Sequence, residues 1–462
     1  MSESRDIRDP IHGFIRLNEQ ESELVDTRAF QRLRNLRQLA LAHLVYPGAM
    51  HTRFEHSLGV CHVAGLLAHS LKFTEDEKRL VRLAALMHDL GHGPFSHVSE
   101  EALELCADRS KLTAKGEKIH ELITAILIRQ DEELSRLLSL SDRDKIIALL
   151  GRGYGEPIVR SVLSGPLDAD KQDYLLRDSY FCGVKYGVFD LPQLHQVLQS
   201  VADPAGGKQL MVDPNGIHTL EQFVLAKYYL TTQVIRHRVR LITDQMLLRA
   251  ICLAIEVDQI EDLAAIYRFD GSLDFIMRYL QWGDSKFLQN FAADSFRGKC
   301  SHALLEGLHH RKLLKLVYQT RLNELHVNAR EALKEISKPE NRPKRQELEK
   351  KLAQCIEEGW GLTKYGTLDP SWFVIVHSYT FKSVKEQSRN DESSILINRP
   401  TPVFFEDAST LFQSIDEKLS ETLVEVYAPV HYSTPTERRN LRNRLRTQIT
   451  SILDTFFCEG DS

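Results

Sequence analysis

The sequence predicts a mainly α-helical protein with a helical core, a short β-hairpin and a smaller mixed α/β region towards the C-terminus. Three observations support this fold class. Apolar residues recur at helical spacing through most of the first two thirds of the chain. Two short apolar runs flank Pro214-Asn215-Gly216, which is a hairpin signal. After about residue 285 the composition becomes charge-rich and then strand-like.

The core elements follow in chain order. The helix at 74–91 has the clearest boundaries, because Thr74 and Glu77 match a capping box and Gly91 is a good C-terminal stop. The hairpin is expected at 208–220, and helices are expected at 27–41, 53–72, 74–91, 117–130, 142–151 and 220–255.

The C-terminal region is expected to be mixed. Residues 328–360 predict a charge-rich helix that breaks around Pro339 and Pro343. Strands are expected at 370–381 and 393–399 with a turn at 389–392, and a last helix ends near residue 456. We therefore expect two domains, a core at residues 1–285 and an assembly or regulatory region at residues 286–462.

Composition excludes several classes of protein. The 462 residues carry a net charge of −5, which argues against a dedicated nucleic-acid or anionic-membrane binder. The seven cysteines form no CxxC pattern and no paired spacing, as in a reduced, cytoplasmic chain without a zinc ribbon. The first ten residues are polar and no window approaches eighteen apolar residues, so we expect neither a signal region nor a membrane span.

The strongest chemical signal is LMHDLGHGPFSH at residues 86–97. His88 and Asp89 are adjacent at the end of an apolar helix and diverge by roughly 100° around it, so both can reach one ion beyond the helix end. Imidazole and carboxylate are ligands that a divalent transition metal accepts. A second imidazole and a second carboxylate must then come from elsewhere in the chain.

Two other segments offer these ligands. HTRFEHS at 51–57 supplies His56, and DADKQDYLLRDS at 168–179 supplies Asp170. Positions 170, 174 and 178 share one helix face with Lys171 beside them. Taken alone, DADKQDY is most simply a solvated acidic helix face. Three ligand-rich segments in this order are hard to arrange by chance.

In combination these segments resemble the HD-domain dNTP triphosphohydrolases, a family that includes the dGTPases and the SAM-and-HD-domain dNTPase of vertebrates. The resemblance starts at RDPIHGFIRLN (8–18) and runs through DTRAFQRLRNLRQL, YPGAMHTRFEHSLGV, HDLGHGPFSH and DKQDYLLRD. It continues weakly to about residue 245 and covers about half of the chain. It implies an HD-domain helical core and metal-dependent hydrolysis of a dNTP to deoxynucleoside and inorganic triphosphate. The implied metal ligands are His56, His88, Asp89 and Asp170.

The resemblance also implies the residues around the nucleotide. A ring of cationic and imidazole side chains suits the stabilisation of phosphate charge and proton donation to the leaving group. The implied catalytic residues near the α-phosphate are His92, His97, His120 and Glu100, the last of which orients a histidine. The implied substrate-binding residues are Arg53 and Lys171 for phosphate, Tyr174 for phosphate or sugar, and Gln38, Leu39 and Asp178 for the sugar.

A second nucleotide site is implied near the N-terminus. Arg5, Asp26, Gln31 and Arg34 match residues that bind an activating guanine nucleotide between subunits in the vertebrate enzyme. A carboxylate at Asp26 can accept both donors of the guanine edge. The alternative is an internal salt bridge between Asp26 and Arg34. The effector interpretation implies a homo-oligomer, a dimer or a tetramer.

The helix after the hairpin departs from the family pattern. Lys227 keeps a basic position, but Thr231 and Ile235 replace a histidine and a tyrosine, so selection against a 2′-hydroxyl is not predicted. RHRVR at 236–240 contacts phosphates or effectors, or forms only a solvated face.

Competing functions remain at this point. His₂Asp₂ ligation suits one divalent ion of Mn, Fe, Zn or Ni, and less readily Mg, although Mg²⁺ can accompany the nucleotide. An HD phosphohydrolase acting on a monophosphate or a signalling nucleotide is the first alternative. The two-metal cyclic-dinucleotide branch carries a His-His pair among its ligands, whereas His309-His310 lies outside the core motifs here. A nucleotide-sensing protein with a vestigial site and a nuclease are further alternatives, and the acidic charge argues against nucleic acid.

Overall fold

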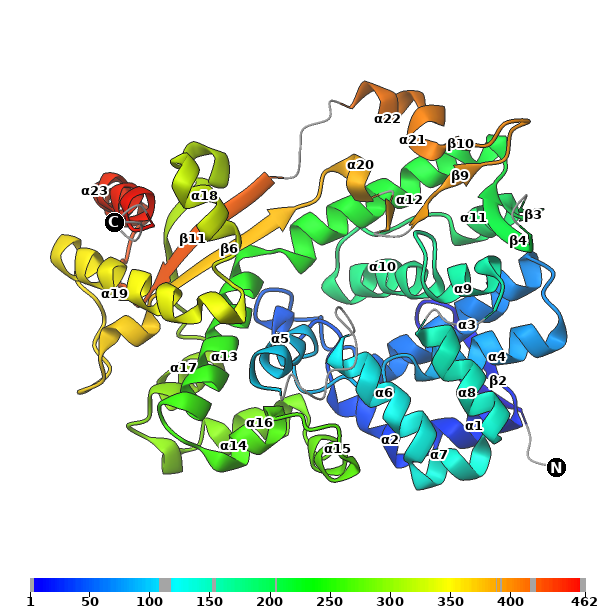
Figure 1. The fold of residues 1–462 in the computed structure, drawn as a ribbon, viewed down its shortest axis with the longest axis horizontal. Coiled ribbons are helices and arrows are strands. Elements are labelled where there is room, and N and C mark those ends of the chain that lie inside the picture. Colours follow the sequence, from blue (N-terminus) through cyan, green and yellow to red (C-terminus); the bar gives the residue numbers. More distant parts are fainter. Residues whose placement is uncertain are drawn as a thin grey trace. The chain divides into compact units, whose positions relative to one another are not determined.

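The computed structural model describes residues 4–107, 118–151, 155–203, 206–387, 389–390, 393–415 and 421–457. Helices dominate it and the strands are short, which confirms the predicted fold class (Figure 1). Among the helices of these ranges, none combines the length and the apolar composition needed to cross a bilayer.

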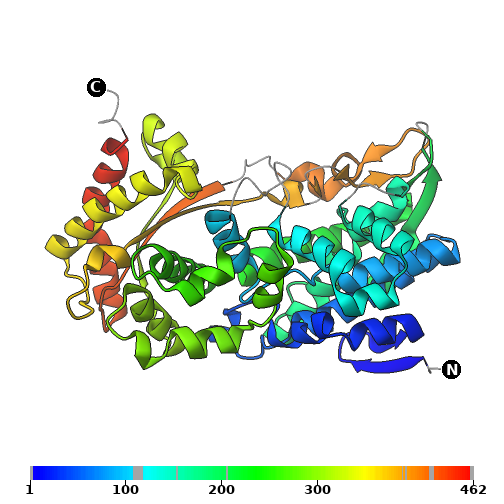
Figure 2. The ribbon, with the colours of Figure 1, turned by 60° about the horizontal axis from the view of Figure 1, so that its bottom comes forward.

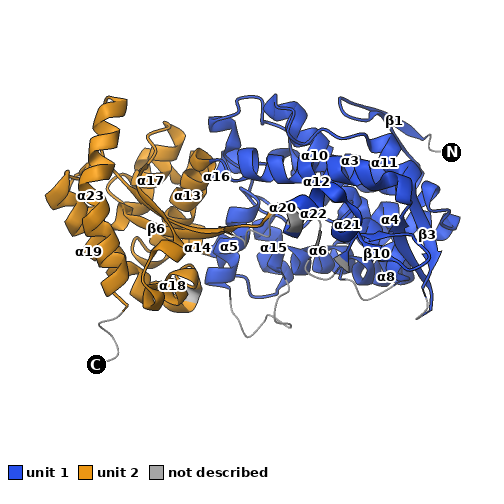
Figure 3. Ribbon diagram, turned by 90° about the horizontal axis from the view of Figure 1, so that it is seen from above, with its two compact units in different colours: residues 1–237, 265–287, 384–417 blue, residues 238–264, 288–383, 418–462 orange. Residues whose placement is uncertain are grey.

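The chain divides into two compact units (Figure 3). Unit 1 comprises residues 1–237, 265–287 and 384–417, and unit 2 comprises residues 238–264, 288–383 and 418–462. The chain therefore enters the other unit at residues 238, 265, 288, 384 and 418. The single boundary expected after residue 285 stays a prediction, and one of these passages lies close to it.

Unit 1 contains the helical core and three small sheets, with strand orders β1-β2, β10-β9-β4-β3 and β7-β8. Its strands are β1 Arg5–Asp9, β2 Gly13–Leu17, β3 Leu198–Ala202, β4 Lys208–Val212, β7 Arg389–Asn390, β8 Ser393–Ser394, β9 Leu396–Ile397 and β10 Val403–Phe404. Its helices and 3-10 or π segments are α1 Glu19–Val25, α2 Arg28–Gln31, η1 Arg32–Asn35, η2 Ala42–Leu44, α3 Arg53–Ser70, α4 Glu75–Met87, α5 His97–Cys106, α6 Ile119–Gln130, α7 Glu132–Leu137, α8 Leu140–Leu150, α9 Pro157–Leu163, α10 Ala169–Cys182, α11 Leu191–Val197, η4 Pro214–Gly216, α12 Ile217–Leu230, η5 Thr231–Ile235, α15 Leu273–Tyr279, α20 Val384–Gln387, α21 Phe405–Ala408 and α22 Thr410–Ser414.

Three helices of unit 1 carry the site, and each has a clear local cause. Both α3 and α4 begin with a capping box, Thr52 with Glu55 and Thr74 with Glu77, so the predicted start of α4 is confirmed. Helix α10 begins at the N-cap Asp168 and ends at a glycine in the left-handed conformation. Helices α4 and α10 both pack on α3, whose residues are mostly buried.

Several predicted boundaries are wrong. Helix α4 ends at Met87 and not at Gly91, because residues 88–96 form an irregular loop. The expected helix at 27–41 ends as α2 and η1 by residue 35. Beyond it the backbone bonds to distant segments instead: Gln38 N donates to the His51 carbonyl at 3.0 Å, and Arg53 N donates to the Leu36 carbonyl at 2.9 Å.

The hairpin predicted at 208–220 is wrong in place, because a hairpin forms earlier in the chain. Strand β4 pairs with β3 before it, and the residues after Pro214-Asn215-Gly216 begin helix α12. Asp213 causes this difference by accepting a hydrogen bond from Asn215 N, which starts η4. The expected helix at 220–255 is likewise divided, by the π-helical segment η5.

The N-terminal hairpin was not predicted. Strands β1 and β2 pair in antiparallel register from Arg5↔Leu17 to Asp9↔Gly13. Figure 2 shows this hairpin, in dark blue, beneath the first helices of the chain. Gly13 has a φ of +75°, a conformation that glycine adopts readily in such a turn.

Unit 2 confirms the mixed α/β character of the C-terminal region. Its sheet has the antiparallel strand order β5-β11-β6, and apolar side chains of the sheet, α19 and α23 form one core. Its elements are α13 Arg238–Glu256, η6 Asp294–Phe296, α17 Cys300–His309, β5 Lys315–Arg321, η7 Leu322–Glu324, α18 Val327–Lys334, η8 Pro339–Asn341, α19 Arg342–Gly359, η9 Pro370–Phe373, β6 Ile375–Phe381, β11 Glu421–Ala428 and α23 Pro435–Thr455, while α14 Glu261–Tyr267 and α16 Asp284–Phe291 contain passages between the units. Residues 391 and 392 of the predicted turn lie outside the described residues.

Candidate active site

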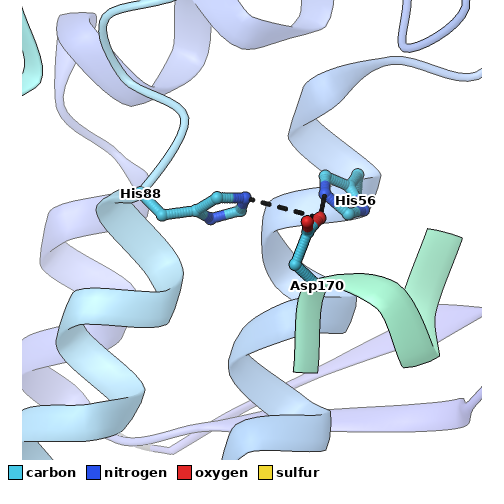
Figure 4. A group of neighbouring side chains, drawn as sticks. All are labelled: His56, His88 and Asp170. Carbon is cyan, nitrogen blue, oxygen red and sulfur yellow. Dashed lines mark ion pairs between the residues drawn. The ribbon is translucent and has the colours of Figure 1, made fainter. Parts of the chain in front are cut away.

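Three side chains from three helical segments converge to a possible metal centre (Figure 4). His56 lies on α3, His88 directly follows α4, and Asp170 lies in the first turn of α10. One ligand atom from each lies within 4.8 Å of the other two. His56 Nε2 is 3.0 Å from Asp170 Oδ1, and His88 Nε2 is 4.0 Å from the same oxygen.

The two imidazoles present the correct nitrogen to this centre. The Nδ1 atom of His88 lies 2.7 Å from the Ala85 carbonyl, and Nδ1 of His56 lies 2.8 Å from Asp173 Oδ2. Both partners accept hydrogen bonds, so Nδ1 carries the proton and Nε2 carries the lone pair. The two Nε2 atoms are buried and form no hydrogen bond within the described part of the chain. Orphaned buried lone pairs facing a carboxylate fit a metal ion.

Asp89 lies beside this group and is held by Arg53. Its Oδ1 is 3.2 Å from His88 Nε2, and its Oδ2 accepts a hydrogen bond from Arg53 Nη1 and is 3.9 Å from His56 Nε2. Burial alone would raise the pKa of the Asp89 carboxyl, but its neighbours Arg53, His88 and His92 hold it well below its usual range. Asp89 is therefore ionised, as a ligand must be.

Sequence reasoning missed Asp173, which is fully buried and orients His56. Asp173 also accepts hydrogen bonds from Arg177 Nε at 2.8 Å and Nη2 at 2.9 Å, and lies 2.7 Å from His12 Nε2. Burial would raise the pKa of Asp173, but the Arg177 guanidinium and the hydrogen bonds with His12 and His56 keep it well below its usual range. Burial lowers the pKa of His56, yet Asp170 and Asp173 together raise it to about 10, so a metal ion bound at Nε2 would replace a proton there. The signal was present as an Asp and an Arg at i and i+4 in DKQDYLLRD.

The predicted catalytic histidines form a second cluster. The rings of His92 and His120 stack with centroids 3.9 Å apart, and His97 meets His92 edge-on at 6.1 Å. Glu100 Oε2 lies 2.9 Å from His120 Nδ1, while its oxygens also accept the backbone N–H groups of Ile119 and His120. Burial, Arg53 and His120 hold the pKa of His92 well below its usual range, so His92 is neutral.

The predicted phosphate ligands lie on α3 and α10, the helices that also carry His56 and Asp170. Arg53 is buried and also donates to Ser96 Oγ at 2.8 Å. Lys171 Nζ lies 2.6 Å from the buried Asp168 carboxylate. Burial and the carboxylates of Asp170, Asp168 and Asp178 raise the pKa of Tyr174 well above its usual value, so its hydroxyl keeps its proton.

The predicted sugar ligands lie on neighbouring segments. Asp178 Oδ1 is 2.8 Å from His51 Nε2, and the His51 ring stacks on Phe181 at 4.7 Å. The His51 carbonyl is bonded to Gln38 N, which brings the Gln38 segment to the same place. Gln38 Oε1 is buried without a hydrogen-bond partner among the described residues, and Leu39 is buried. Gln38 therefore offers an acceptor to a hydroxyl group.

The loop at residues 88–96, which carries His88 and His92, is held in place by the buried side chains of Arg32 and Asp284. Arg32 donates to the carbonyls of Leu90 at 2.9 Å and His92 at 2.6 Å. Asp284 accepts hydrogen bonds from Phe95 N at 2.8 Å and Arg37 N at 3.0 Å. Phe95 and Ser96 have φ of 62° and 54°, which is unusual outside glycine and is maintained here by these contacts.

The four predicted effector residues line one pocket. This pocket has a volume of about 340 Å³, and its polar wall includes Arg8, Asp9 and Glu55 in addition to Arg5, Asp26, Gln31 and Arg34. Arg5 forms a bidentate pair with Asp26 at 2.9 and 2.8 Å. The alternative pairing of Asp26 with Arg34 is not formed, because Arg34 donates to Gln31 Oε1 at 2.9 Å and lies over the Phe54 ring.

The segment that departs from the family pattern has an irregular backbone. Thr231 and Ile235 are the first and last residues of the π-helical segment η5, and Lys227 lies one turn earlier in α12. Tyr46 Oη donates to the Gln233 carbonyl of this segment at 2.9 Å. A π-helical turn shifts the register of the side chains that follow it.

Comparison with known families identifies an HD domain at residues 53–173 and an HD-associated region at residues 204–354. The protein called uncharacterized protein MJ1154 in Methanocaldococcus jannaschii is 37% identical over 262 residues, which are 56% of this chain and 52% of that protein. The Dictyostelium discoideum protein named deoxynucleoside triphosphate triphosphohydrolase SAMHD1 homolog is 32% identical over 288 residues, 58% of this chain and 54% of that protein. The chain spans about half the length of the curated relatives that it matches.

A solved structure shares the fold. The crystal structure of a hypothetical protein from Aquifex aeolicus matches with a TM-score of 0.68 and 27% identity, and the match covers 96% of this chain and 100% of that one. The four predicted metal ligands all fall within the HD-domain match.

Proposed function

Because the chain belongs to the HD-domain family of SAMHD1-like proteins, we propose that it hydrolyses deoxynucleoside triphosphates to deoxynucleoside and inorganic triphosphate. The observation that carries this proposal is the convergence of His56, His88 and Asp170, with both Nε2 lone pairs turned to one point. The stacked histidines beside this point and the cationic side chains of Arg53 and Lys171 support a phosphate ester as the substrate.

The metal ligands would be His56, His88, Asp89 and Asp170. A divalent ion held there would supply Lewis acidity towards the α-phosphoryl group and would activate a water for attack. Asp89 must release one oxygen from Arg53 or share it, because the same carboxylate faces both the guanidinium and the two imidazoles. Arg53 then neutralises a phosphate oxygen close to the site of attack.

The protein's own groups account for cleavage of the bond between the α-phosphorus and the 5′-oxygen, which releases the deoxynucleoside and leaves the triphosphate intact. His120 is fixed by Glu100 through Nδ1, so its Nε2 can deliver a proton to the leaving oxygen. His92 is neutral and stacks on His120, so it adds no positive charge beside the ring that would donate the proton. Lys171 and Tyr174 hold phosphate oxygens, and Gln38 and Asp178 hold the sugar hydroxyl.

The pocket at Arg5, Asp26, Gln31 and Arg34 would bind a regulatory nucleotide. Cationic side chains suit its phosphates, and the Asp26 carboxylate suits the donor edge of a purine. We further propose a homo-oligomer and a cytoplasmic location.

Product analysis by chromatography tests the proposed function. The purified protein is incubated with each dNTP and each NTP in Mn²⁺, with and without GTP, and Asp89→Ala serves as the control. Deoxynucleoside and intact triphosphate, absent in the variant, are expected. Orthophosphate, pyrophosphate or no product from every dNTP would contradict the proposal. The NTP incubations show whether Thr231 and Ile235 leave room for a 2′-hydroxyl.

A further inference from the structure

The turn of the N-terminal hairpin reaches the metal site through buried side chains. Asp9 and His12 lie at the two ends of this turn, between β1 and β2. Asp9 Oδ1 accepts the backbone N–H groups of Ile11 and His12, both at 2.9 Å, so one carboxylate oxygen maintains the turn. The other oxygen, Oδ2, accepts a hydrogen bond from Arg177 Nη1 at 2.8 Å.

Two routes lead from this turn to the same carboxylate. Arg177 uses its remaining donors on Asp173, with Nε bonded to Oδ2 and Nη2 bonded to Oδ1. His12 reaches Asp173 Oδ1 directly at 2.7 Å. Asp173 in turn holds Nδ1 of His56. The side chains of Arg177 and Asp173 are fully buried, so solvent does not weaken these bonds.

The same Asp9 also lines the pocket that contains Arg5 and Asp26. One residue thus belongs to the wall of the pocket and to the chain of bonds Asp9–Arg177–Asp173–His56. We propose that Asp9 and His12 are positioning residues for the metal ligand His56, and that they couple the state of the pocket to the affinity of the metal site. This inference rests on the proposed metal-dependent function.

The physical basis is the orientation of an imidazole by an outer partner. A histidine that donates Nδ1–H to a carboxylate is fixed in ring angle and tautomer, and loss of such a partner costs about 10–100-fold in metal affinity. Asp173 can perform this role only while its own position is fixed, and in this structure Arg177 and His12 fix it. A ligand that displaces Asp9 would release Arg177 and loosen His56.

The test is a titration of Mn²⁺ into protein stripped of metal. Calorimetry and the electron paramagnetic resonance signal of free Mn²⁺ both measure the binding. Asp9→Asn keeps the oxygen that caps the turn but turns an amide N–H₂ towards Arg177, where two donors then face each other. We expect its affinity for Mn²⁺ to fall by about tenfold or more. The control is Asp6→Asn, on the same strand as Asp9. It removes an exposed carboxylate that pairs with Arg16 of β2, and it should leave the affinity unchanged.

A second pair of variants separates positioning from packing. His12→Gln keeps a donor for Asp173 and His12→Leu does not, so Gln should retain more Mn²⁺ affinity than Leu, whereas a packing role would not favour the amide. Wild-type affinity in Asp9→Asn, or equal affinities in the two His12 variants, overturns the inference while the proposed function stands. Failure of the unsubstituted protein to bind Mn²⁺ would overturn both.

Discussion

The imidazole rings of His92 and His120 are stacked nearly parallel, with an angle of 17° between their planes and 3.9 Å between their centroids. Two protonated imidazoles at this distance would repel each other, so the pair holds one positive charge at most under ordinary conditions. The environment decides which ring is neutral: burial, Arg53 and His120 lower the pKa of His92, while Glu100 accepts the Nδ1 proton of His120. This arrangement favours His120 as the proton donor of the proposed reaction.

Replacement of His120 should therefore reduce turnover more than substrate binding. In His120→Gln the amide can still meet Glu100 but cannot transfer a proton to the leaving 5′-oxygen, and we expect kcat to fall by about 10²–10⁴-fold. KM should change little. Steady-state kinetics with the preferred dNTP measure both quantities. A variant with unchanged kcat would remove His120 from the proposed mechanism.

The Glu100 carboxylate should matter through His120. Glu100→Gln preserves shape, but an amide cannot accept the N–H groups of Ile119 and His120 and the Nδ1 proton together. We expect a fall in kcat of about tenfold, smaller than that of His120→Gln. Glu104→Gln, on the same helix but exposed, is the matched control. Equal kinetics in the two glutamine variants would contradict the orienting role.

Removal of the Arg5–Asp26 pair should affect nucleotide binding and leave the fold intact. Both side chains are about half exposed, and exposed ion pairs contribute only about 0–1 kcal/mol to stability. We expect Arg5→Ala to keep the melting temperature within a few degrees and to lose calorimetric binding of GTP. Arg16→Ala, which removes the exposed partner of Asp6, should retain GTP binding. Undiminished GTP binding in Arg5→Ala would exclude the pocket as the regulatory site.

Asp284 should make stability fall as the pH rises from about 4 to about 6. Burial raises the pKa of this carboxyl to about 6 in the folded protein, above the 3.8 of an exposed aspartate. The native state therefore binds the proton more tightly than the unfolded state, and its stabilising contribution is complete below pH 4 and lost above pH 6. The effect is of the order of 3 kcal/mol.

Urea unfolding of wild type and Asp284→Asn at pH 4.5 and pH 7 measures this effect. The difference between the two free energies of unfolding should shift against the wild type at the higher pH. The comparison cancels titrating groups that the two proteins share. A pH-independent difference would mean that Asp284 keeps an ordinary pKa in the native state.

Local chemistry predicted part of this molecule well. The capping box at Thr74 fixed the start of α4, and the density of ligand types in three segments selected His56, His88 and Asp170, which the fold brings together. These signals are contained in a few adjacent residues.

Long-range contacts explain what could not be predicted. The helical pattern at 27–41 is overruled after residue 35 because backbone groups find partners at His51, Arg53 and Asp284. The proposed positioning role of Asp9 and His12 depends on contacts between the turn of the N-terminal hairpin and α10. Residue spacing along the chain does not predict these contacts. The hydrogen bond from Asn215 N to Asp213 Oδ1 is a local contact, but it favours a 3-10 turn where Pro214-Asn215-Gly216 had indicated a hairpin.

Unit 1 is completed by residues 384–417, which supply β9 as the parallel neighbour of β4. During synthesis the ribosome therefore exposes the outer edge of β4 until nearly two hundred more residues have emerged, since Asn398 N is the donor that meets the Val212 carbonyl. An open strand edge invites pairing with other chains. A gene shortened to the expected core of residues 1–285 would make that exposure permanent. Expression of residues 1–462 covers the β4 edge and should reduce aggregation.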